Sequence, residues 1–433
     1  MTWMRSSGST KLGSAYRGGS ALRSLPPVRL DGGSSRRLGL GFRGRSSRGR
    51  LSDLLRRAFA RNSILRRLDW VLVLAVLALS LVGTVLVYAA TEPTLRQAGS
   101  DPHTYLVKQL LNIAIGLVLL AGVSMLDYRQ IRMLSPIVLV VSCLGLLAVL
   151  TPLGSVVNGA KSWITLPGGF QIEPSEYAKI SIILVGAMFL SGLRQGETRP
   201  RLRAVGLTIA CAAVPLLLVI AEPDLGVTML MVALLIGLIA LSGIRLRWLG
   251  LLAVVGGVGV LAVVKLHLLK SYQLSRLTSF LNPNADPRGT GYSAYQSKIA
   301  IASGYKTGQG LFHGQLVAGN FVPEQHTDFI FAVAGEELGF VGCLVIIGLL
   351  ALVLVRALHI AYRADDQFGM LVAAGIAIWF GVQSFINIGM TVGIMPVTGL
   401  PLPFVSYGGS AIFADMIAIG VLQAVHRRRI VFT

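Results

Sequence analysis

Residues 321–331 read FVPEQHTDFIF and mark the point where a long polar stretch of the chain gives way to a long apolar one. Three titratable side chains, Glu324, His326 and Asp328, therefore fall where water is expected to meet hydrocarbon. A carboxylate in that position carries a free-energy cost unless it is paired, hydrated by a cavity or used in function. The stretch thus predicts a membrane protein with chemistry at the membrane surface.

Apolar runs extend along most of the chain on either side of this stretch. The 433 residues are 54% hydrophobic and only 13% charged, whereas soluble domains carry about 25% charged residues. The runs are about 18 to 25 residues long, which matches the hydrocarbon core of a bilayer crossed by an α-helix and is too long for the strands of a transmembrane barrel. We expect an all-α, polytopic integral membrane protein with ten spans, near residues 70–90, 105–125, 133–151, 174–192, 204–221, 224–242, 248–268, 328–355, 368–390 and 404–425.

Positive charge is concentrated in the loops on one side of the predicted bundle. These loops and the C-terminus carry Arg129, Arg132, Arg194, Arg199, Arg201, Arg203, Arg245, Arg247, Arg356, Arg363, Arg427, Arg428 and Arg429. Such loops stay in the cytoplasm, which puts both termini there. The seventh and eighth spans are then joined by a large outer loop, 269–327, in which residues 293–301 favour a short helix.

The formal net charge is +20, and much of it precedes the first span. Residues 1–50 are rich in Arg, Ser and Gly, a composition that predicts a disordered basic cytoplasmic tail. Residues 51–69 separate Leu from Arg at helical spacing and predict an amphipathic juxtamembrane helix. The tail either fixes topology, binds anionic membrane lipids or serves as a docking arm for a partner. We expect no nucleic-acid binding because the tail is tethered to a membrane and offers no stacking platform. Residues 427–433 are expected to form a short cytoplasmic tail.

The first of four polar constellations surrounds the start of the fourth span. Trp163 beside Lys161 suits anchoring at the membrane interface. Glu176 and Lys179 are three residues apart, so they share one face of the helix. They form either a structural ion pair or, with Lys161, part of a site in which lysines bind phosphate as point charges.

Two further constellations lie at the outer ends of later spans. Residues 222–226 read EPDLG, and these carboxylates either stabilise a helix N-terminus, bind a cation or line a cavity. Residues 399–410 read GLPLPFVSYGGS, which predicts non-helical backbone at membrane depth. Such backbone is tolerated where it is buried in protein or lines a watery cavity, and this makes Ser406 a candidate substrate contact. The alternative is a helix start with small-residue packing.

The eighth span carries the remaining constellation. If its helix begins at Asp328, Glu336 lies about 80° around the helix and Glu337 about 180°. Asp328 and Glu336 then line one cavity, while Glu337 faces elsewhere. Asp328 either caps the helix or, because Thr327 can cap it instead, stays free for function. All four constellations lie at outer ends of spans, which predicts one extracytoplasmic cavity.

Taken in order, these motifs resemble the SEDS family (shape, elongation, division and sporulation) over about residues 70–426. The resemblance rests on residues 159–163, 174–179, 222–226, 323–331, 336–339 and 403–410. It implies a ten-helix membrane domain that polymerises peptidoglycan from lipid II at the outer face of the bacterial cytoplasmic membrane, with a class B penicillin-binding protein as partner. Residues 323–328 and 399–403 resemble the RodA branch, which serves elongation and cell shape, more than the FtsW branch, which serves division.

The resemblance implies that Asp328 is the essential acid and Trp163 a functional residue. In the implied reaction, a sugar hydroxyl of one lipid-linked disaccharide joins the anomeric carbon of another, and undecaprenyl diphosphate leaves. Asp328 would act as the general base or as a ligand of Mg²⁺ or Mn²⁺, with no organic cofactor. The residues expected to contact the substrate are Trp163, Lys161, Glu176, Lys179, His326, Glu324, Glu336 and Ser406.

Two other functions are compatible with these residues. A lipid II flippase or another transporter also uses polar groups within its spans, and a scaffold would act by activating a penicillin-binding partner. The acidic clusters near one face and the long outer loop favour an extracytoplasmic enzyme over a transporter, whereas the scaffold stays an open alternative.

Overall fold

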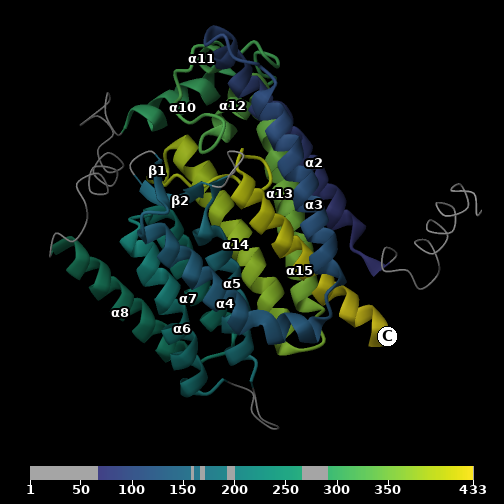
Figure 1. Cartoon of the computed structure of the whole chain (residues 1–433), viewed down its shortest axis with the longest axis vertical. Helices are drawn as coiled ribbons and strands as arrows, with labels where there is room; N and C mark the ends of the chain where they lie inside the picture. The colour runs from purple at the N-terminus through teal and green to yellow at the C-terminus, as the bar shows by residue number, and fades with distance from the viewer. Residues whose placement is uncertain (1–66, 158–159, 166–170, 193–199, 266–290, 433) are drawn as a thin grey trace, which may run out of the picture. The chain divides into compact units, whose positions relative to one another are not determined.

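A computed structural model describes residues 67–157, 160–165, 171–192, 200–265 and 291–432 of this chain (Figure 1). The predicted basic tail, most of the predicted amphipathic segment and residues 269–290 of the outer loop lie outside these residues, so those predictions stay untested.

Each of the ten predicted spans coincides with a long helix or contains most of one. These helices are α2 (Trp70–Gln97), α3 (Thr104–Met125), α4 (Tyr128–Leu150), α5 (Pro174–Leu190), α6 (Leu202–Ala221), α7 (Leu225–Leu241), α8 (Leu246–Lys265), α13 (Gly339–Tyr362), α14 (Gln367–Val392) and α15 (Gly409–Phe432). Among the described residues, seven helices are long and apolar enough to cross a membrane. The predicted helical membrane fold is thereby confirmed, although α15 continues through the residues expected to form the C-terminal tail.

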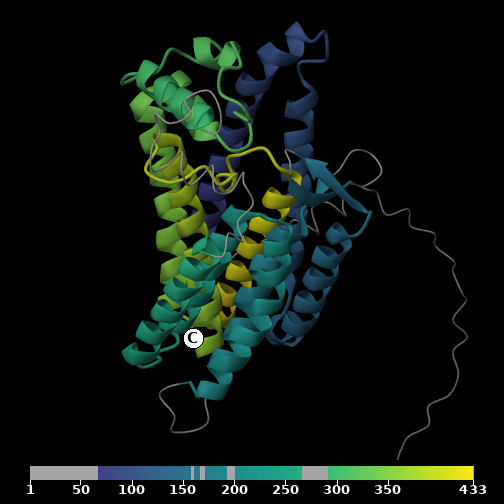
Figure 2. The ribbon, with the colours of Figure 1, turned by 90° about the vertical axis from the view of Figure 1, so that its left-hand side faces the viewer.

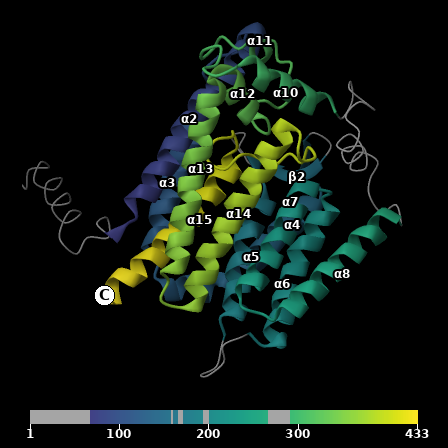
Figure 3. The same cartoon turned by 180° about the vertical axis from the view of Figure 1, so that it is seen from behind.

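The outward-facing side chains of the bundle are apolar. Val118 and Met133 are each 71% exposed, and Leu217 is 64% exposed. Water would penalise so many exposed hydrophobic side chains, whereas lipid does not. Figure 3 shows α8 at the edge of the bundle, where it packs against α7.

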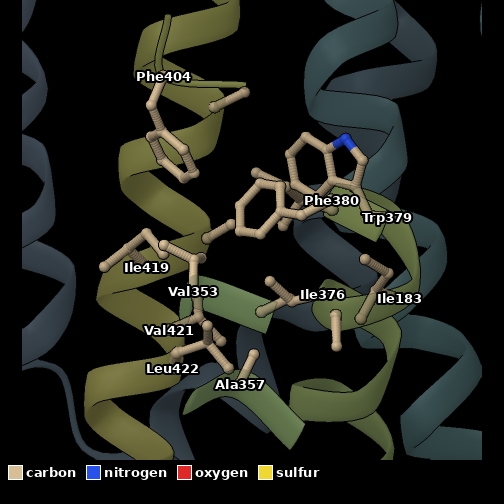
Figure 4. Close-up of a cluster of buried hydrophobic side chains, with 14 of the residues drawn as sticks. Ile183, Val353, Ala357, Ile376, Trp379, Phe380, Phe404, Ile419, Val421 and Leu422 are labelled. Atoms are coloured by element: carbon tan, nitrogen blue, oxygen red, sulfur yellow. The ribbon is translucent and has the colours of Figure 1, made fainter. Parts of the chain in front are cut away.

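The centre of the bundle is formed by α14 and α15. In the most apolar 18-residue stretch of each of these helices, 72% of the residues are buried, compared with 22% in α4. The ring centres of Trp379 and Phe380 of α14 lie 5.1 Å apart with the rings tilted by 34°, and Phe380 meets Phe404 edge-on at 5.0 Å. Figure 4 shows these rings together with Ile183 of α5 and Ile419 of α15. This core fixes α14 against the segment that precedes α15.

The predicted eighth span is two helices rather than one. α12 (Ile330–Glu337) ends before Gly339, and α13 begins there. Gly339 has φ +67°, and a Cβ on it would lie 2.2 Å from the backbone nitrogen of Gly308. The chain bends here because a distant loop approaches too closely for any side chain. Asp328 therefore precedes α12 and is not part of the spanning helix, so the angle expected between Asp328 and Glu336 on one helix does not apply.

Two features of the loops accompany these helices. The α4–α5 connection contains a three-stranded antiparallel sheet in the order β1 (Gly154–Val157), β2 (Ala160–Thr165) and β3 (Gln171–Ile172), which the all-α prediction missed. The outer loop contains α10 (Tyr292–Ser303), as predicted, and the short α11 (Gln315–Ala318). Figure 2 shows α10 to α12 in green beside the yellow-green segment that precedes α15.

The end of α12 holds the outer loop through its two carboxylates. Glu336 is fully buried and accepts the backbone N–H groups of Leu316 at 2.8 Å and Val317 at 3.1 Å. Glu337 accepts the N–H of Phe312 at 3.3 Å. Glu336 thus stabilises the start of α11 as a helix-terminal carboxylate does.

At the opposite end of the bundle, one buried carboxylate joins three helices. Asp69 caps α2 by accepting the N–H of Leu72 at 3.1 Å, and it accepts Nε of Arg356 on α13 at 2.9 Å. Its backbone N–H and carbonyl bond the side-chain amide of Gln423 on α15 at 2.8 and 3.1 Å.

We expect Arg356→Met to lower the free energy of unfolding by about 3 kcal/mol, because it leaves a buried carboxylate without its cation. This value is near the lower end for buried pairs, since the Arg356 side chain is 27% exposed. The measurement is the thermal unfolding midpoint in detergent. Adding Asp69→Asn, which keeps the cap acceptor but removes the charge, should recover part of the loss. An unchanged midpoint for Arg356→Met alone would show that the pair contributes nothing.

A second prediction concerns pH and Glu337. Burial raises the pKa of Glu337 from 4.5 to about 7, against the lowering effect of the Phe312 N–H. Between these values the folded state holds a proton that the unfolded chain releases, so stability falls as pH rises, by up to about 1.4 kcal/mol per pH unit.

Glu337→Gln keeps an acceptor for Phe312 but removes this titration. Unfolding midpoints of both proteins should therefore be recorded between about pH 5 and pH 7. We expect the midpoint of the variant to rise relative to that of the wild type as pH increases. Parallel curves for the two proteins would refute the assignment.

Candidate functional site

The loop before α12 forms a tight turn that presents Asp328. Glu324 has φ +51°, and its carbonyl accepts the N–H groups of Thr327 at 3.2 Å and Asp328 at 3.1 Å. Asp328 itself is half-buried. The turn therefore holds the carboxylate at the boundary between the loop and the bundle, as the sequence predicts.

The segment 399–407 lies directly beside this turn. Tyr407 donates its N–H to the carbonyl of His326 at 3.0 Å. Gly399 has φ +80°, and a Cβ there would lie 3.5 Å from Oδ2 of Asp328. Two of the predicted constellations thus form one surface around the Asp328 carboxylate.

His326 belongs to a cluster of three half-buried rings. Its imidazole meets the ring of Tyr105 at 5.1 Å and that of Tyr407 at 5.7 Å, and the two tyrosines meet at 5.0 Å. Burial lowers the pKa of His326, although the nearby Glu324 carboxylate opposes this effect. Burial therefore favours the neutral imidazole over a fixed cation. Glu324 is exposed and accepts the hydroxyl of Thr327 at 3.3 Å.

Two side-chain amides on α14 connect the other side of this surface to the bundle. Asn387 donates Nδ2 to the carbonyls of Asp328 at 2.8 Å and Leu400 at 2.7 Å. Gln383, one turn earlier, donates Nε2 to the carbonyl of Pro401 at 2.8 Å. Gln383 and Asn387 are four positions apart in sequence, so both lie on one face of α14.

Gln383 also reaches the buried ion pair of α5. Lys179 lies 2.6 Å from Glu176, and both side chains are at most 1% exposed. The Lys179 ammonium donates to Oε1 of Gln383 at 3.1 Å and lies 4.8 Å from the Trp379 ring centre. This geometry matches the structural ion pair that was one of the two alternatives for these residues.

Asp415 of α15 completes the buried polar cluster. Its Oδ2 accepts the N–H of Phe404, which has φ +65°, at 3.2 Å. It also interacts electrostatically with Glu176 and Lys179. The segment before α15 is therefore held by the Asp415 carboxylate as well as by the amides of Gln383 and Asn387 on α14.

The EPDLG motif lies close to the same cluster. Asp224 caps α7 by accepting the N–H of Val227 at 2.9 Å. Burial raises the pKa of Glu222 to about 8, and Asp224 adds to this rise. Burial also raises the pKa of Glu173 well above its usual range, with further contributions from Glu176 and Asp224. All four predicted constellations are thus linked at one end of the bundle.

Some predicted site residues have other partners. Lys161 donates to the last carbonyl of α4, that of Leu150, at 3.2 Å, and Trp163 is half-buried on β2 opposite Ser155. The Ser406 hydroxyl accepts the N–H of Leu402 at 2.8 Å, within its own loop. Glu336 holds α11, as described above. Lys161 and Lys179 each have a partner of their own.

Sequence reasoning missed three polar side chains of the site, Gln383, Asn387 and Asp415. Gln383 and Asn387 are the amides at positions i and i+4 of an otherwise apolar run, and Asp415 is a lone carboxylate in another. Their spacing on a helix was the available signal, because polar groups inside a membrane span require partners.

Comparisons with known proteins agree with this picture. A family model described as "Cell cycle protein" (FTSW_RODA_SPOVE) matches residues 69–430. "Peptidoglycan glycosyltransferase MrdB" of Escherichia coli is 37% identical over 362 residues, covering 84% of this chain and 94% of the relative. "Stage V sporulation protein E" of Bacillus subtilis is 37% identical over 364 residues, covering 83% and 97%. "Probable peptidoglycan glycosyltransferase FtsW" of Trichlorobacter lovleyi is 37% identical over 376 residues, covering 86% and 95%.

Solved structures agree as well. The crystal structure of the rod shape determining protein RodA of Thermus thermophilus has a TM-score of 0.61 at 28% identity, covering 84% of this chain and 97% of that chain. A chain of a peptidoglycan synthase complex that coordinates polymerization and crosslinking has a TM-score of 0.69 at 30% identity, covering 84% and 98%. With nearly the whole membrane domain matched in sequence and in fold, this chain belongs to the FtsW/RodA/SpoVE family, the SEDS family of membrane proteins.

Proposed function

We propose that this chain is a peptidoglycan glycosyltransferase that polymerises lipid II into glycan strands, with Asp328 as the residue that carries the chemistry. Family membership and the names of its relatives support the glycosyltransferase activity. The role of Asp328 rests on two observations: this half-buried residue places its carboxylate beside Gly399, and its backbone carbonyl accepts a hydrogen bond from Asn387. Anchoring the backbone of Asp328 restricts the positions that its carboxylate can take, which favours a preorganised site.

The reaction forms one bond and breaks another. A sugar hydroxyl of one lipid-linked disaccharide attacks the anomeric carbon of a second, and the bond from that carbon to the diphosphate oxygen breaks. Undecaprenyl diphosphate leaves with the electron pair. Asp328 accepts the proton of the attacking hydroxyl as general base. A lipid-linked substrate suits a site at the membrane boundary, because its tail stays in hydrocarbon while its head group reaches the carboxylate.

The departing diphosphate requires positive charge. Lys179 is fully buried between Glu176 and Gln383, so Lys161 in the α4–α5 loop is the more accessible of the two predicted lysines. Among the described residues, no group of three His, Cys, Asp or Glu side chains could hold a metal ion. Mg²⁺ needs fewer protein ligands, since it commonly binds one or two carboxylates together with substrate phosphates. Asp328 and the diphosphate would hold such an ion, which would neutralise charge on the leaving group.

Location and partners follow from the same reading. We place the chain in the bacterial cytoplasmic membrane with both termini in the cytoplasm, because arginines concentrate in the loops at that end. Its partner would be a class B penicillin-binding protein, consistent with the similarity to a chain of a peptidoglycan synthase complex. The basic tail would bind anionic lipids. Relatives named MrdB and FtsW are equally identical to this chain, so overall identity does not separate the two branches. We therefore assign the chain to the elongation branch on the basis of residues 323–328 and 399–403.

The test is glycan synthesis from purified lipid II by the full chain with its partner and Mg²⁺ or Mn²⁺ in detergent. We expect Asp328→Asn, which is isosteric but not basic, to lower the rate by at least about 100-fold, within the range that general-base catalysis contributes. Thermal unfolding of the variant serves as the folding control.

Strands of normal yield from Asp328→Asn would contradict the proposal. Transbilayer movement of lipid II in vesicles without polymer would favour the flippase instead. Intact synthesis in Asp328→Asn, lost only when contact with the penicillin-binding protein is broken, would favour the scaffold.

A further inference from the structure

The segment that borders the Asp328 carboxylate cannot hold itself in place. Residues 399–403 read GLPLP, and Pro401 and Pro403 have no N–H to donate. A proline-rich backbone forms neither a helix nor a sheet ladder, so its buried carbonyls need donors from elsewhere. Leu400 is 1% exposed, so its carbonyl is one that requires such a donor.

One face of α14 supplies these donors. Gln383 and Asn387 bond the consecutive carbonyls of Pro401 and Leu400 at 2.8 and 2.7 Å. Both side chains are fully buried. The amides therefore bind the segment 399–403 to the most buried part of the bundle.

Asn387 differs from Gln383 in one respect: it also bonds Asp328. Its Nδ2 carries two hydrogens, and the two acceptors are the carbonyls of Asp328 and Leu400. These residues are 72 positions apart in the chain. Leu400 is the neighbour of Gly399, the residue that the Asp328 carboxylate approaches. A single side chain thus links Asp328 to the segment beside its own carboxylate.

We propose that Asn387 is a positioning residue for the glycosyl transfer, which it serves by holding Asp328 in register with the segment 399–403. This inference rests on the proposed function, in which Asp328 carries the chemistry. Asn387 acts through the backbone of Asp328 and does not touch the substrate. Without its two hydrogen bonds the two loops are free to separate, and misplacement by about 1 Å lowers a rate by about 100-fold.

The first experiment compares Asn387→Leu with wild type in polymerisation of lipid II by the full chain and its penicillin-binding partner. Leu has the same number of side-chain heavy atoms and the same branching at Cγ as Asn, but no donor. We expect kcat to fall by about 100-fold and KM for lipid II to stay within about 2-fold, because Asn387 affects the position of the base and not the affinity for substrate.

Thr391→Val is the matched control on α14. Thr391 is also fully buried and lies one turn further along α14, but its hydroxyl donates to the carbonyl of Ile388 in its own helix, at 2.7 Å, and bonds no other described residue. We expect this variant to keep the kcat of the wild type. A comparable loss of kcat in Thr391→Val would show that any change on this face of α14 disturbs the enzyme, and would overturn the specific role of Asn387.

The second experiment uses Asn387→Asp, whose number of donors depends on pH. An ionised carboxylate offers no hydrogen and would face two carbonyls, whereas a protonated carboxyl donates one bond. The ratio of variant to wild-type kcat should therefore rise as pH falls, while the same ratio for Asn387→Leu stays flat. A role confined to packing predicts no such difference between the two variants.

The outcomes separate this inference from the proposed function. Wild-type kcat in Asn387→Leu, alongside loss of activity in Asp328→Asn, overturns the positioning role and leaves the proposed function standing. Full activity in Asp328→Asn overturns the proposed function itself. If Asn387→Leu does not fold, the pH dependence of Asn387→Asp decides, and a flat ratio overturns the inference.

Discussion

The structure depends on one constraint: backbone polar groups at membrane depth must find partners within the protein. The helices meet it through their own hydrogen bonds, whereas the segment 399–407 and the turn at 324–328 meet it only in part in this way. Side chains of the bundle supply further partners, namely Asn387 and Gln383 from α14 and Asp415 from α15. The residues that stabilise the irregular backbone are thus the residues that fix the surface around Asp328.

The buried charges extend this support into the bundle. Lys179 of α5 pairs with Glu176 and donates to Gln383, which in turn bonds Pro401. Asp415 lies within electrostatic reach of the same lysine. A buried ion pair contributes little net stability by itself, since desolvation offsets attraction. Its value here is orientation, because the pair fixes the amide that holds the segment beside the site.

The sequence was sufficient to predict what depends on local pattern. The ten apolar runs, the short helix near 293–301 and the gathering of polar motifs at one end of the bundle follow from hydropathy, turn chemistry and position. Asp328 could be singled out because a carboxylate beside an apolar run needs a reason to be there.

What the sequence left open depends on contacts between distant segments. The break before α13 arises from the approach of Gly308 to Gly339, and the role of Glu336 depends on the position of α11. Asn387 and Gln383 look like isolated amides in an apolar helix until their partners, up to 204 residues away, are known. The small sheet before α5 was missed because its strands are short and its motif resembled an interfacial loop.

The most direct test of the account is an experimental structure of the chain with its penicillin-binding partner and two lipid-linked disaccharides bound. The account predicts that the Asp328 carboxylate lies within about 2.6–3.2 Å of the attacking sugar hydroxyl, or reaches the substrate through one water or metal ion. It also predicts that Asn387 still bonds the carbonyls of Asp328 and Leu400. Head groups bound at another face of the bundle, with Asp328 out of reach, would contradict it.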